Sequence, residues 1–268
     1  MPTISANGIE IAYDVQGAGH PVVLISGLGY GGWYWQWVAA ALAEHYQVIT
    51  FDNRGAGGSS QPSGPYTVAM MAADTAGLLD GLGVRGAYVV GHSLGGFIAQ
   101  ELVVTRPDLV GKLVLAATNH GGKNVIPITP EALAVIMNRE GDPLEVIRRG
   151  IAVACAPGFS EVQPDKVQAL IDYRLSGPVP QAQYTAQTMA GAGMAMLSDE
   201  QVAQRMAAIT VPVLVLFGEH DNVVPPGNAE LLTSKLPNAT AVILPGVGHM
   251  FPIEDPTTTA KTLHDFFG

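Results

Sequence analysis

The chain has 268 residues, of which 48% are hydrophobic and 13% charged, so one domain with a large buried core is expected rather than disorder. Its formal net charge of −10 disfavours nucleic acid and acidic membrane surfaces as partners. With a single cysteine, Cys155, no signal-peptide pattern and no apolar run near the roughly 18 residues that span a bilayer, a cytoplasmic protein without disulfides or membrane contact is expected.

The first predicted element is a hairpin, since residues 9–15 alternate apolar and polar side chains directly after Asn7 and Gly8. From Pro21 onward the apolar runs are short and continuous, which is typical of parallel strands covered on both faces. These runs cover residues 22–25, 48–51, 88–90, 113–115, 213–216 and 241–244. Helical segments lie between them, at 35–43, 68–82, 97–105, 229–236 and 258–267. This alternation predicts an α/β fold, a mostly parallel eight-stranded sheet with helices on both faces and the hairpin at one edge.

Residues 121–208 break the alternation, because they contain no convincing strand. Helical stretches are predicted there at 130–139, 144–154, 165–175 and 181–189. Such an insertion predicts a helical cap over the carboxyl edge of the sheet, with residues 1–120 and 209–268 as the core. The insertion also carries methionines that either fill gaps between small helices or line an adaptable apolar pocket, namely Met137, Met189, Met194, Met196 and Met206.

A serine flanked by glycines stands where a predicted strand meets a predicted helix. Gly91 to Gly96 follow the apolar run at 88–90, and Ser93 lies two residues from a glycine on either side. This is the pattern of a nucleophile elbow, a turn so tight that side chains at the flanking glycines would collide with the neighbouring strand and helix. Ser93 is therefore expected to present its hydroxyl at the carboxyl edge of the sheet, beside the positive end of a helix.

A serine nucleophile needs a base to take its proton and a carboxylate to orient that base. Asp221 follows the predicted strand at 213–216 and His249 follows the one at 241–244, so both are expected at the same sheet edge as Ser93. The loop after 113–115 offers no alternative carboxylate, which favours Asp221. His120 ends that strand facing the predicted pocket and is a candidate substrate contact.

Two backbone N–H groups are expected to stabilise the negative oxygen that forms when the serine attacks a carbonyl. The N–H of Leu94, directly after the nucleophile, is one, and that of Leu28, in the loop after residues 22–25, is the other. Three further residues are candidate substrate contacts, Gly27 and Trp33 near this loop and Met137 in the predicted cap.

The same loop also fits a different class of protein. Residues 27–32 match the GxGxxG pattern of dinucleotide-binding folds, and Asp52 ends the next strand at the spacing of the acid that binds a ribose. Against this hypothesis, the helix after the third glycine opens with bulky aromatic side chains, and Ser93, Asp221 and His249 would have no role. The sequence contains neither a metal-binding motif nor a phosphate loop, so neither a metal nor a cofactor is expected.

Taken together, these residues resemble the α/β-hydrolase superfamily along nearly the whole chain. The resemblance rests on the oxyanion loop at 26–29, the segment 52–59, the elbow at 91–96, and the loops that hold Asp221 and His249. The details look most like small bacterial carboxylesterases, enol-lactonases and aminoacrylate hydrolases. Many such relatives carry His-Gly where the oxyanion loop of this chain begins with Ser-Gly. Related dehalogenases and epoxide hydrolases use an aspartate nucleophile, which a serine at the elbow disfavours.

The resemblance implies a two-step acyl transfer in which Ser93 attacks, His249 moves the proton and Asp221 orients the imidazole. The leading hypothesis is a serine hydrolase of small to medium carboxylic esters. The alternatives are a lactonase, a hydrolase of carbon–carbon bonds, and a small-molecule receptor that keeps the same fold but turns over slowly. Four cations could reach the pocket and anchor a charged substrate: Arg54, Lys123, Arg139 and Arg174.

Overall fold

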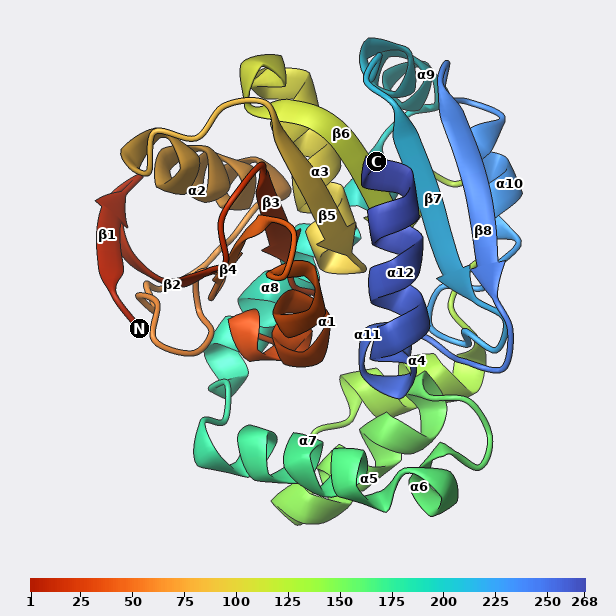
Figure 1. Cartoon of the computed structure of the whole chain (residues 1–268). Helices are drawn as coiled ribbons and strands as arrows, with labels where there is room; N and C mark the ends of the chain where they lie inside the picture. The colour runs from red at the N-terminus through yellow and green to blue at the C-terminus, as the bar shows by residue number, and fades with distance from the viewer.

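The computed structural model describes all residues from 1 to 268, and its central element is a sheet of eight strands (Figure 1). The strands lie side by side in the order β1-β2-β4-β3-β5-β6-β7-β8. β2 is antiparallel to β1 and β4, and the other neighbouring pairs are parallel, which confirms the predicted sheet. The bounds are β1 Thr3–Ala6, β2 Ile9–Gln16, β3 Pro21–Ile25, β4 Gln47–Phe51, β5 Ala87–His92, β6 Val110–Ala116, β7 Val213–Gly218 and β8 Ala239–Leu244.

Helices occur at every predicted position, and α6, α9 and α11 are additional. The α-helices are α1 Gln36–Leu42, α2 Val68–Gly81, α3 Leu94–Thr105, α4 Pro130–Met137, α5 Pro143–Ala154, α6 Phe159–Val162, α7 Pro164–Ser176, α8 Gln181–Gly193, α9 Asp199–Ala208, α10 Asn228–Thr233, α11 Phe251–Glu254 and α12 Pro256–Phe267. Short 3-10 helices are η1 Gly32–Trp35, η2 Pro107–Leu109 and η3 Met194–Met196. No helix of the structure combines the length and apolar character that crossing a membrane requires.

The opening hairpin has the predicted two-residue turn. Ala6 pairs with Ile9, which leaves Asn7 and Gly8 as the turn residues, with φ angles of 48° and 76°. Positive φ at both positions is the requirement of a type I′ turn, whose twist matches that of the flanking strands. The hairpin therefore follows from local sequence, and it supplies the antiparallel edge of the sheet.

Both faces of the sheet are buried, which explains the continuous apolar runs. In β3, Val22 and Leu24 belong to one hydrophobic cluster, whereas Val23 and Ile25 belong to the other, because successive side chains point to opposite faces. The first cluster includes buried residues of α1 and α12, and the second includes those of α2, α3, α9 and α10. Helices cover both faces of these parallel strands, so among the parts of the sheet the strand ends are the place where a site can form.

The helices α4 to α7 lie together beyond the arrowheads of β5, β7 and β8, at the bottom of Figure 1. This is the carboxyl edge of the parallel strands, where the cap was predicted. By contrast, α9 lies at the opposite end of the sheet, beside the start of β7, and its residues Val202 and Met206 are buried in the core. Since β7 runs parallel to β6, the chain has to return to the amino edge before β7 begins, and α9 makes that return.

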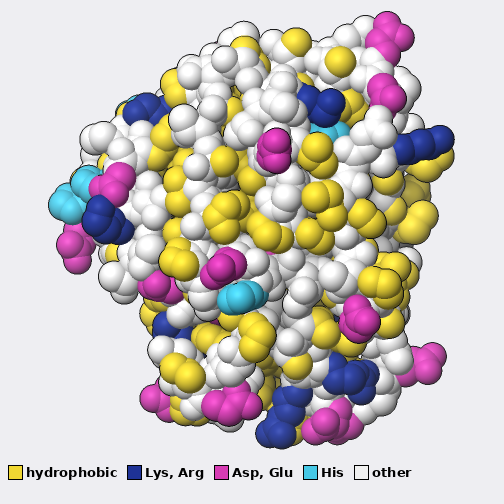
Figure 2. All heavy atoms as spheres, turned by 90° about the vertical axis from the view of Figure 1, so that its right-hand side faces the viewer, with side chains coloured by type: hydrophobic (Ala, Val, Ile, Leu, Met, Phe, Trp, Pro, Cys, Tyr) yellow, Lys and Arg dark blue, Asp and Glu magenta, His cyan; other side chains and the backbone are white.

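Figure 2 shows the face that carries the edge strand β8 and the helix α10. Hydrophobic side chains gather near its centre. Ile243 of β8 is 43% exposed. Charged side chains of both signs lie mainly toward the rim of this face.

Candidate active site

The serine of the predicted elbow stands in a sharp turn between β5 and α3. Its φ of 56° is positive, which is a strained backbone conformation for a residue with a side chain. A Cβ added at Gly91 would lie 2.3 Å from the Gly95 carbonyl oxygen, and one added at Gly95 would lie 2.3 Å from that of Ile25. Neither position has room for a side chain, as the pattern predicted. The Ser93 N–H donates to the Ala116 carbonyl at 2.9 Å, which fixes the turn against the end of β6.

The side chains of Asp221 and His249 are joined by a hydrogen bond. Nδ1 of His249 lies 2.8 Å from Oδ2 of Asp221, and both residues are buried. The other carboxylate oxygen accepts the backbone N–H groups of Val223 and Val224, each at 2.8 Å. Because the carboxylate is held as an acceptor, Nδ1 of a neutral His249 carries the ring proton. Nε2 is then the nitrogen that can accept one.

Ser93 and His249 line the same cavity at the carboxyl edge of the sheet. The Ser93 hydroxyl forms no hydrogen bond within the protein, and its side chain is partly exposed. The cavity has a volume of about 150 Å³, similar to that of an engineered cavity that holds benzene. The enclosed space therefore suits a small organic group that reaches the serine hydroxyl.

His92 holds the backbone of His249 from the core side. Its Nε2–H donates to the His249 carbonyl at 2.8 Å, and the Tyr34 hydroxyl lies 3.1 Å from the same nitrogen. Burial, followed by the charge of His249, holds the pKa of His92 well below its usual range. His92 is therefore neutral and positions the loop of His249.

Glu254 ties the same loop to the cap. Its carboxylate accepts the Gly248 N–H at 3.0 Å and the Ala156 N–H, just past α5, at 2.7 Å. Burial raises the pKa of Glu254, and the backbone N–H groups that it accepts oppose this effect. One carboxylate thus connects the residue before His249 with the end of a cap helix.

The N–H groups of Leu28 and Leu94 both lack an acceptor within the protein. Leu94 is the first residue of α3, so its N–H has no acceptor within the helix, and the Leu28 N–H donates to no group of the protein. Leu28 and Gly27 line the cavity with Ser93. A Cβ added at Gly27 would lie 3.1 Å from the Ser93 Cβ, so the loop runs directly against the nucleophile.

The loop at residues 26–29, the predicted oxyanion loop, is held in place by Ser26. The Ser26 hydroxyl donates to the Gly31 carbonyl at 2.8 Å, across the loop. Asn53, from the loop after β4, donates its Nδ2 to the Ser26 carbonyl at 3.0 Å. The Ser26 hydroxyl and the buried Asn53 amide therefore anchor the loop.

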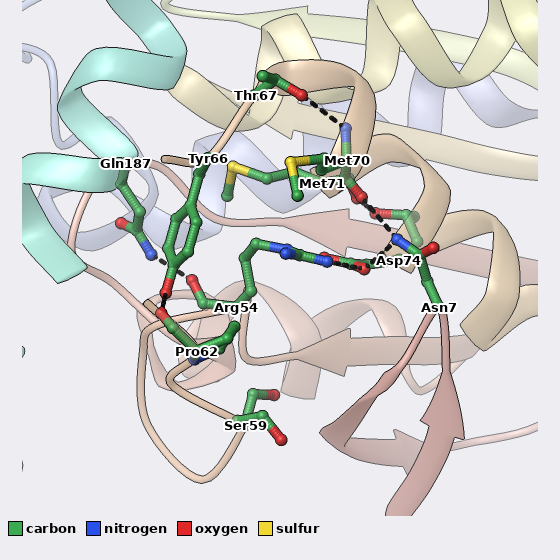
Figure 3. Close-up of polar contacts among 12 residues, drawn as sticks. Asn7, Arg54, Ser59, Pro62, Tyr66, Thr67, Met70, Met71, Asp74 and Gln187 are labelled. Atoms are coloured by element: carbon green, nitrogen blue, oxygen red, sulfur yellow. Dashed lines mark hydrogen bonds and ion pairs between the residues drawn. The ribbon is translucent and has the colours of Figure 1, made fainter. Parts of the chain in front are cut away.

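Two residues of the 121–208 insertion hold Gly29, the residue after Leu28. Gln187 of α8 accepts the Gly29 N–H at 2.9 Å, and Arg174 of α7 donates to the Gly29 carbonyl at 2.6 Å. Gln187 is fully buried, and its amide also donates to the Arg54 carbonyl at 2.8 Å (Figure 3). The position of the Leu28 N–H therefore depends on side chains far away in the sequence.

Replacing Gln187 with methionine is expected to destabilise the protein and slow any reaction that uses the Leu28 N–H. The variant keeps the side-chain volume but leaves the Gly29 N–H and the Arg54 carbonyl buried without partners, at a cost of about 2 to 4 kcal/mol in unfolding free energy. Since losing an oxyanion donor entirely costs on the order of 100- to 1000-fold, a displaced donor is expected to lower kcat by about 10- to 100-fold. Urea unfolding and ester turnover measure the two effects.

Gln183, one turn earlier on α8, provides the matched control. It is only partly buried, and its amide makes only a 3.3 Å hydrogen bond to the Gln61 carbonyl. Gln183→Met is expected to change neither the unfolding free energy nor kcat measurably. Equal losses in the two variants would show that the loop does not depend on Gln187.

Arg54 is not available to the cavity, although the sequence made it a candidate. Its guanidinium forms a buried pair with Asp74 of α2, with distances of 2.5 Å and 2.6 Å (Figure 3). Asn7 of the hairpin turn donates to the same carboxylate at 2.8 Å. The hydrogen bond to Asp74 raises the pKa of Arg54. Arg54 therefore fastens the loop after β4 to α2 and the hairpin, and its charge is neutralised.

Comparison with known proteins decides the family of this chain. Residues 20–256 match the profile of a family described as the alpha/beta hydrolase fold. The chain belongs to the α/β-hydrolase fold family. Among its relatives, "Putative non-heme bromoperoxidase BpoC" of Mycobacterium tuberculosis H37Rv is 34% identical over 278 residues, which cover 97% of this chain and 98% of that protein.

Solved structures of similar α/β-hydrolases cover the whole fold. A thermophilic esterase from Thermogutta terrifontis superimposes with a TM-score of 0.82 at 26% identity, covering 100% of this chain and 98% of the esterase. The enol-lactonase from Burkholderia xenovorans LB400 superimposes with a TM-score of 0.81 at 25% identity, covering 99% of each chain. This hydrolase therefore shares its fold with both proteins over nearly its full length.

Of the four predicted substrate contacts in this α/β-hydrolase, only Gly27 lines the cavity. Trp33 instead stacks on Tyr173, with 4.3 Å between ring centroids. His120 is buried elsewhere and donates from Nδ1 to the Gly121 carbonyl at 2.7 Å. Met137 is 60% exposed at the end of α4. The structure thus places these three side chains away from the serine.

The five methionines of the 121–208 insertion do not form a pocket either. Met194 and Met206 are buried in the core cluster. Met137, Met189 and Met196 are exposed. None of the five lines the cavity. Filling gaps between helices therefore fits the two buried methionines, whereas the three exposed ones neither fill a gap nor line the pocket.

The cavity wall contributed by the cap was not predicted, although a signal for it existed. Val146, Ile147, Gly150 and Ala154 of α5 all line the cavity. They recur at the three- and four-residue spacing of one helix face, which marks a face turned toward the protein. The remaining cap residues of the lining are Val135, Ile136, Arg139, Arg174 and Tyr184.

Asp52 of this hydrolase does not occupy a dinucleotide site. One carboxylate oxygen accepts the Gly32 N–H and the other accepts the Gly58 N–H, each at 2.7 Å. Asp52 is buried, and a Cβ added at Gly31 would lie 2.1 Å from its carboxylate. Gly31, inside the segment that resembles a fingerprint, therefore has to lack a side chain so that its loop can close against this aspartate.

Proposed function

We propose that this α/β-hydrolase is a serine hydrolase that cleaves small carboxylic esters through an acyl-enzyme on Ser93. The observation that carries the proposal is the Asp221–His249 hydrogen bond of 2.8 Å, with His249 lining the same cavity as the strained, unpaired Ser93. A hydroxyl, an imidazole and a buried carboxylate at one site are the components of acyl transfer. A purely structural role would not account for the strain at Ser93.

In the proposed reaction, His249 Nε2 takes the proton of Ser93 while the serine oxygen attacks the ester carbonyl. The carbonyl oxygen becomes negative and is bound by the N–H groups of Leu28 and Leu94. His249 then returns the proton to the leaving alcohol, and the acyl group remains on Ser93. A water molecule, deprotonated by His249, hydrolyses this intermediate, and Asp221 stabilises the imidazolium in both steps.

The size of the cavity supports a small substrate. A volume of about 150 Å³ holds a group of roughly six carbons, so short acyl chains are expected to fit better than long ones. Among the similar structures are an esterase and an enol-lactonase, both of which act on an ester bond. A lactone is therefore the second candidate, since a ring of this size fits the same space and uses the same three residues.

The protein is expected to hydrolyse 4-nitrophenyl acetate and butyrate with a preference for these over the decanoate. A fluorophosphonate probe is expected to label one residue, identified by mass spectrometry of the peptide that contains Ser93, and to abolish turnover in proportion to labelling. Tight ligand binding without product release would instead indicate a receptor. Turnover that survives complete labelling would contradict the proposed role of Ser93.

A further inference from the structure

The cavity contains positive charge without any negative counterpart. Among the residues that line it, the only charged side chains are Arg139 and Arg174, and no aspartate or glutamate is present. Neither arginine takes part in an ion pair anywhere in the protein. This is unexpected in a chain with a net charge of −10, because acidic side chains outnumber basic ones overall.

Arg139, just past the end of α4, has an unused donor. Its Nη2 makes a 3.3 Å hydrogen bond to the Val179 carbonyl, and its guanidinium lies 4.0 Å from the centroid of the Tyr184 ring. Its Nη1 is buried and has no hydrogen-bond partner. A buried donor without a hydrogen-bond partner is costly, and the protein supplies no partner for Nη1.

Arg174 differs, because the fold already uses it. Its Nη1 donates to the Gly29 carbonyl at 2.6 Å, and its guanidinium lies 4.7 Å from the centroid of the Tyr30 ring. It therefore holds the oxyanion loop and adds a second positive charge to the cavity. Burial, followed by the charge of Arg174, lowers the pKa of Arg139, which is the direction expected when two cations share a site without an anion.

We propose that the natural ester carries a carboxylate group and that Arg139 binds it. This inference rests on the proposed esterase function and narrows its substrate class. A carboxylate would give the buried Nη1 a charge-assisted hydrogen bond and offset the positive charge of both arginines. Arg139 lines the cavity, and its planar guanidinium is held over the Tyr184 ring, so its fork of donors lies beside the space that the carboxylate would occupy.

Two matched pairs of esters test the proposal. The first compares the 4-nitrophenyl half-ester of adipic acid with 4-nitrophenyl hexanoate, so that only the acyl part changes charge. The second compares 3-acetoxybenzoate with its methyl ester, so that only the alcohol part does. The wild-type protein is expected to favour the anionic member of at least one pair by about 10- to 100-fold in kcat/KM, and the preferred pair tells which part carries the carboxylate.

Arg139→Gln is expected to remove that preference, because kcat/KM of the anionic ester falls by about 10- to 100-fold while that of the neutral ester falls far less. Arg148→Gln, at an exposed position of α5 outside the cavity, is the matched control and should leave both esters unaffected. A wild-type preference for the neutral member of both pairs would overturn the proposal. An equal loss on anionic and neutral esters in Arg139→Gln would also overturn it.

Failure of the carboxylate site and failure of the esterase function give different results. Hydrolysis of neutral esters without any charge preference leaves the esterase function standing and rejects the role of Arg139. If neither ester of any pair is hydrolysed, calorimetric titration with adipate decides the question. Binding that is lost in Arg139→Gln then supports an anion site without esterase activity, and no binding by the wild-type protein rejects the site as well.

Discussion

Ser93→Ala is expected to lower kcat for a small aryl ester by about a millionfold, and adding His249→Ala to it is expected to lower kcat no further. The two residues act as one unit, because the imidazole contributes only by moving the serine proton. Once the hydroxyl is gone, the remaining rate comes from the N–H groups of Leu28 and Leu94 and from substrate binding. Stopped assays of the single and double variants at high enzyme concentration measure this residual rate.

The stability of Ser93→Ala separates chemistry from folding. The hydroxyl forms no hydrogen bond within the protein, so the unfolding free energy is expected to stay within about 0.5 kcal/mol of the wild-type value. A variant that is inactive and equally stable has lost only the nucleophile. If the double variant were far slower than either single variant, serine and histidine would act independently, and the acyl-enzyme mechanism would be wrong.

The elbow and the two loops that hold Asp221 and His249 could be predicted because each is a local pattern at the end of a strand. Parallel strands bring such ends to one edge, so local patterns were enough to predict the Asp221–His249 hydrogen bond between residues 28 apart in the chain. The same logic predicted the strands, since continuous apolar runs such as that of β3 are required when both faces are covered.

The cap could not be predicted to the same depth, because its helices meet the core through contacts that no local pattern encodes. Successive residues on a helix point about 100° apart, so Ile136 lines the cavity while Met137, one position later, is exposed. The hydrogen bond from Gly29 to Gln187 joins residues 158 apart in the chain. Only the three-dimensional packing shows that such a residue positions the oxyanion loop.

Several separate attachments make the sheet edge that carries Ser93 and His249 depend on the 121–208 insertion. Gln187 and Arg174 hold the residue after Leu28, whereas Glu254 joins the residue before His249 to the end of α5. The oxyanion loop and the histidine loop are thus each fixed to the insertion by buried or charge-assisted hydrogen bonds. Changes in the cap that leave the cavity lining intact can therefore alter turnover as well as substrate choice.

Asp221→Asn is expected to lower kcat by about 10,000-fold while changing the geometry of the site very little. The asparagine oxygen can still accept the N–H groups of Val223 and Val224, which now hold the carboxylate at 2.8 Å. Its NH₂ group then faces Nδ1 of His249, and because a donor cannot accept a proton, Nδ1 has to become the acceptor. The ring proton moves to Nε2, the nitrogen that should take the proton of Ser93.

Glu219→Gln is the matched control, because it also replaces a carboxylate with an amide in the loop after β7. Glu219 is exposed and accepts the Gly246 N–H, but it does not touch His249. It is expected to retain nearly full activity, which removes net charge as the cause of any loss at Asp221. Proton NMR of the imidazole Nδ1–H gives a second readout, since its strongly downfield resonance should be present in Glu219→Gln and absent in Asp221→Asn. Loss of that resonance without a loss of turnover would mean that the tautomer of His249 does not control the reaction.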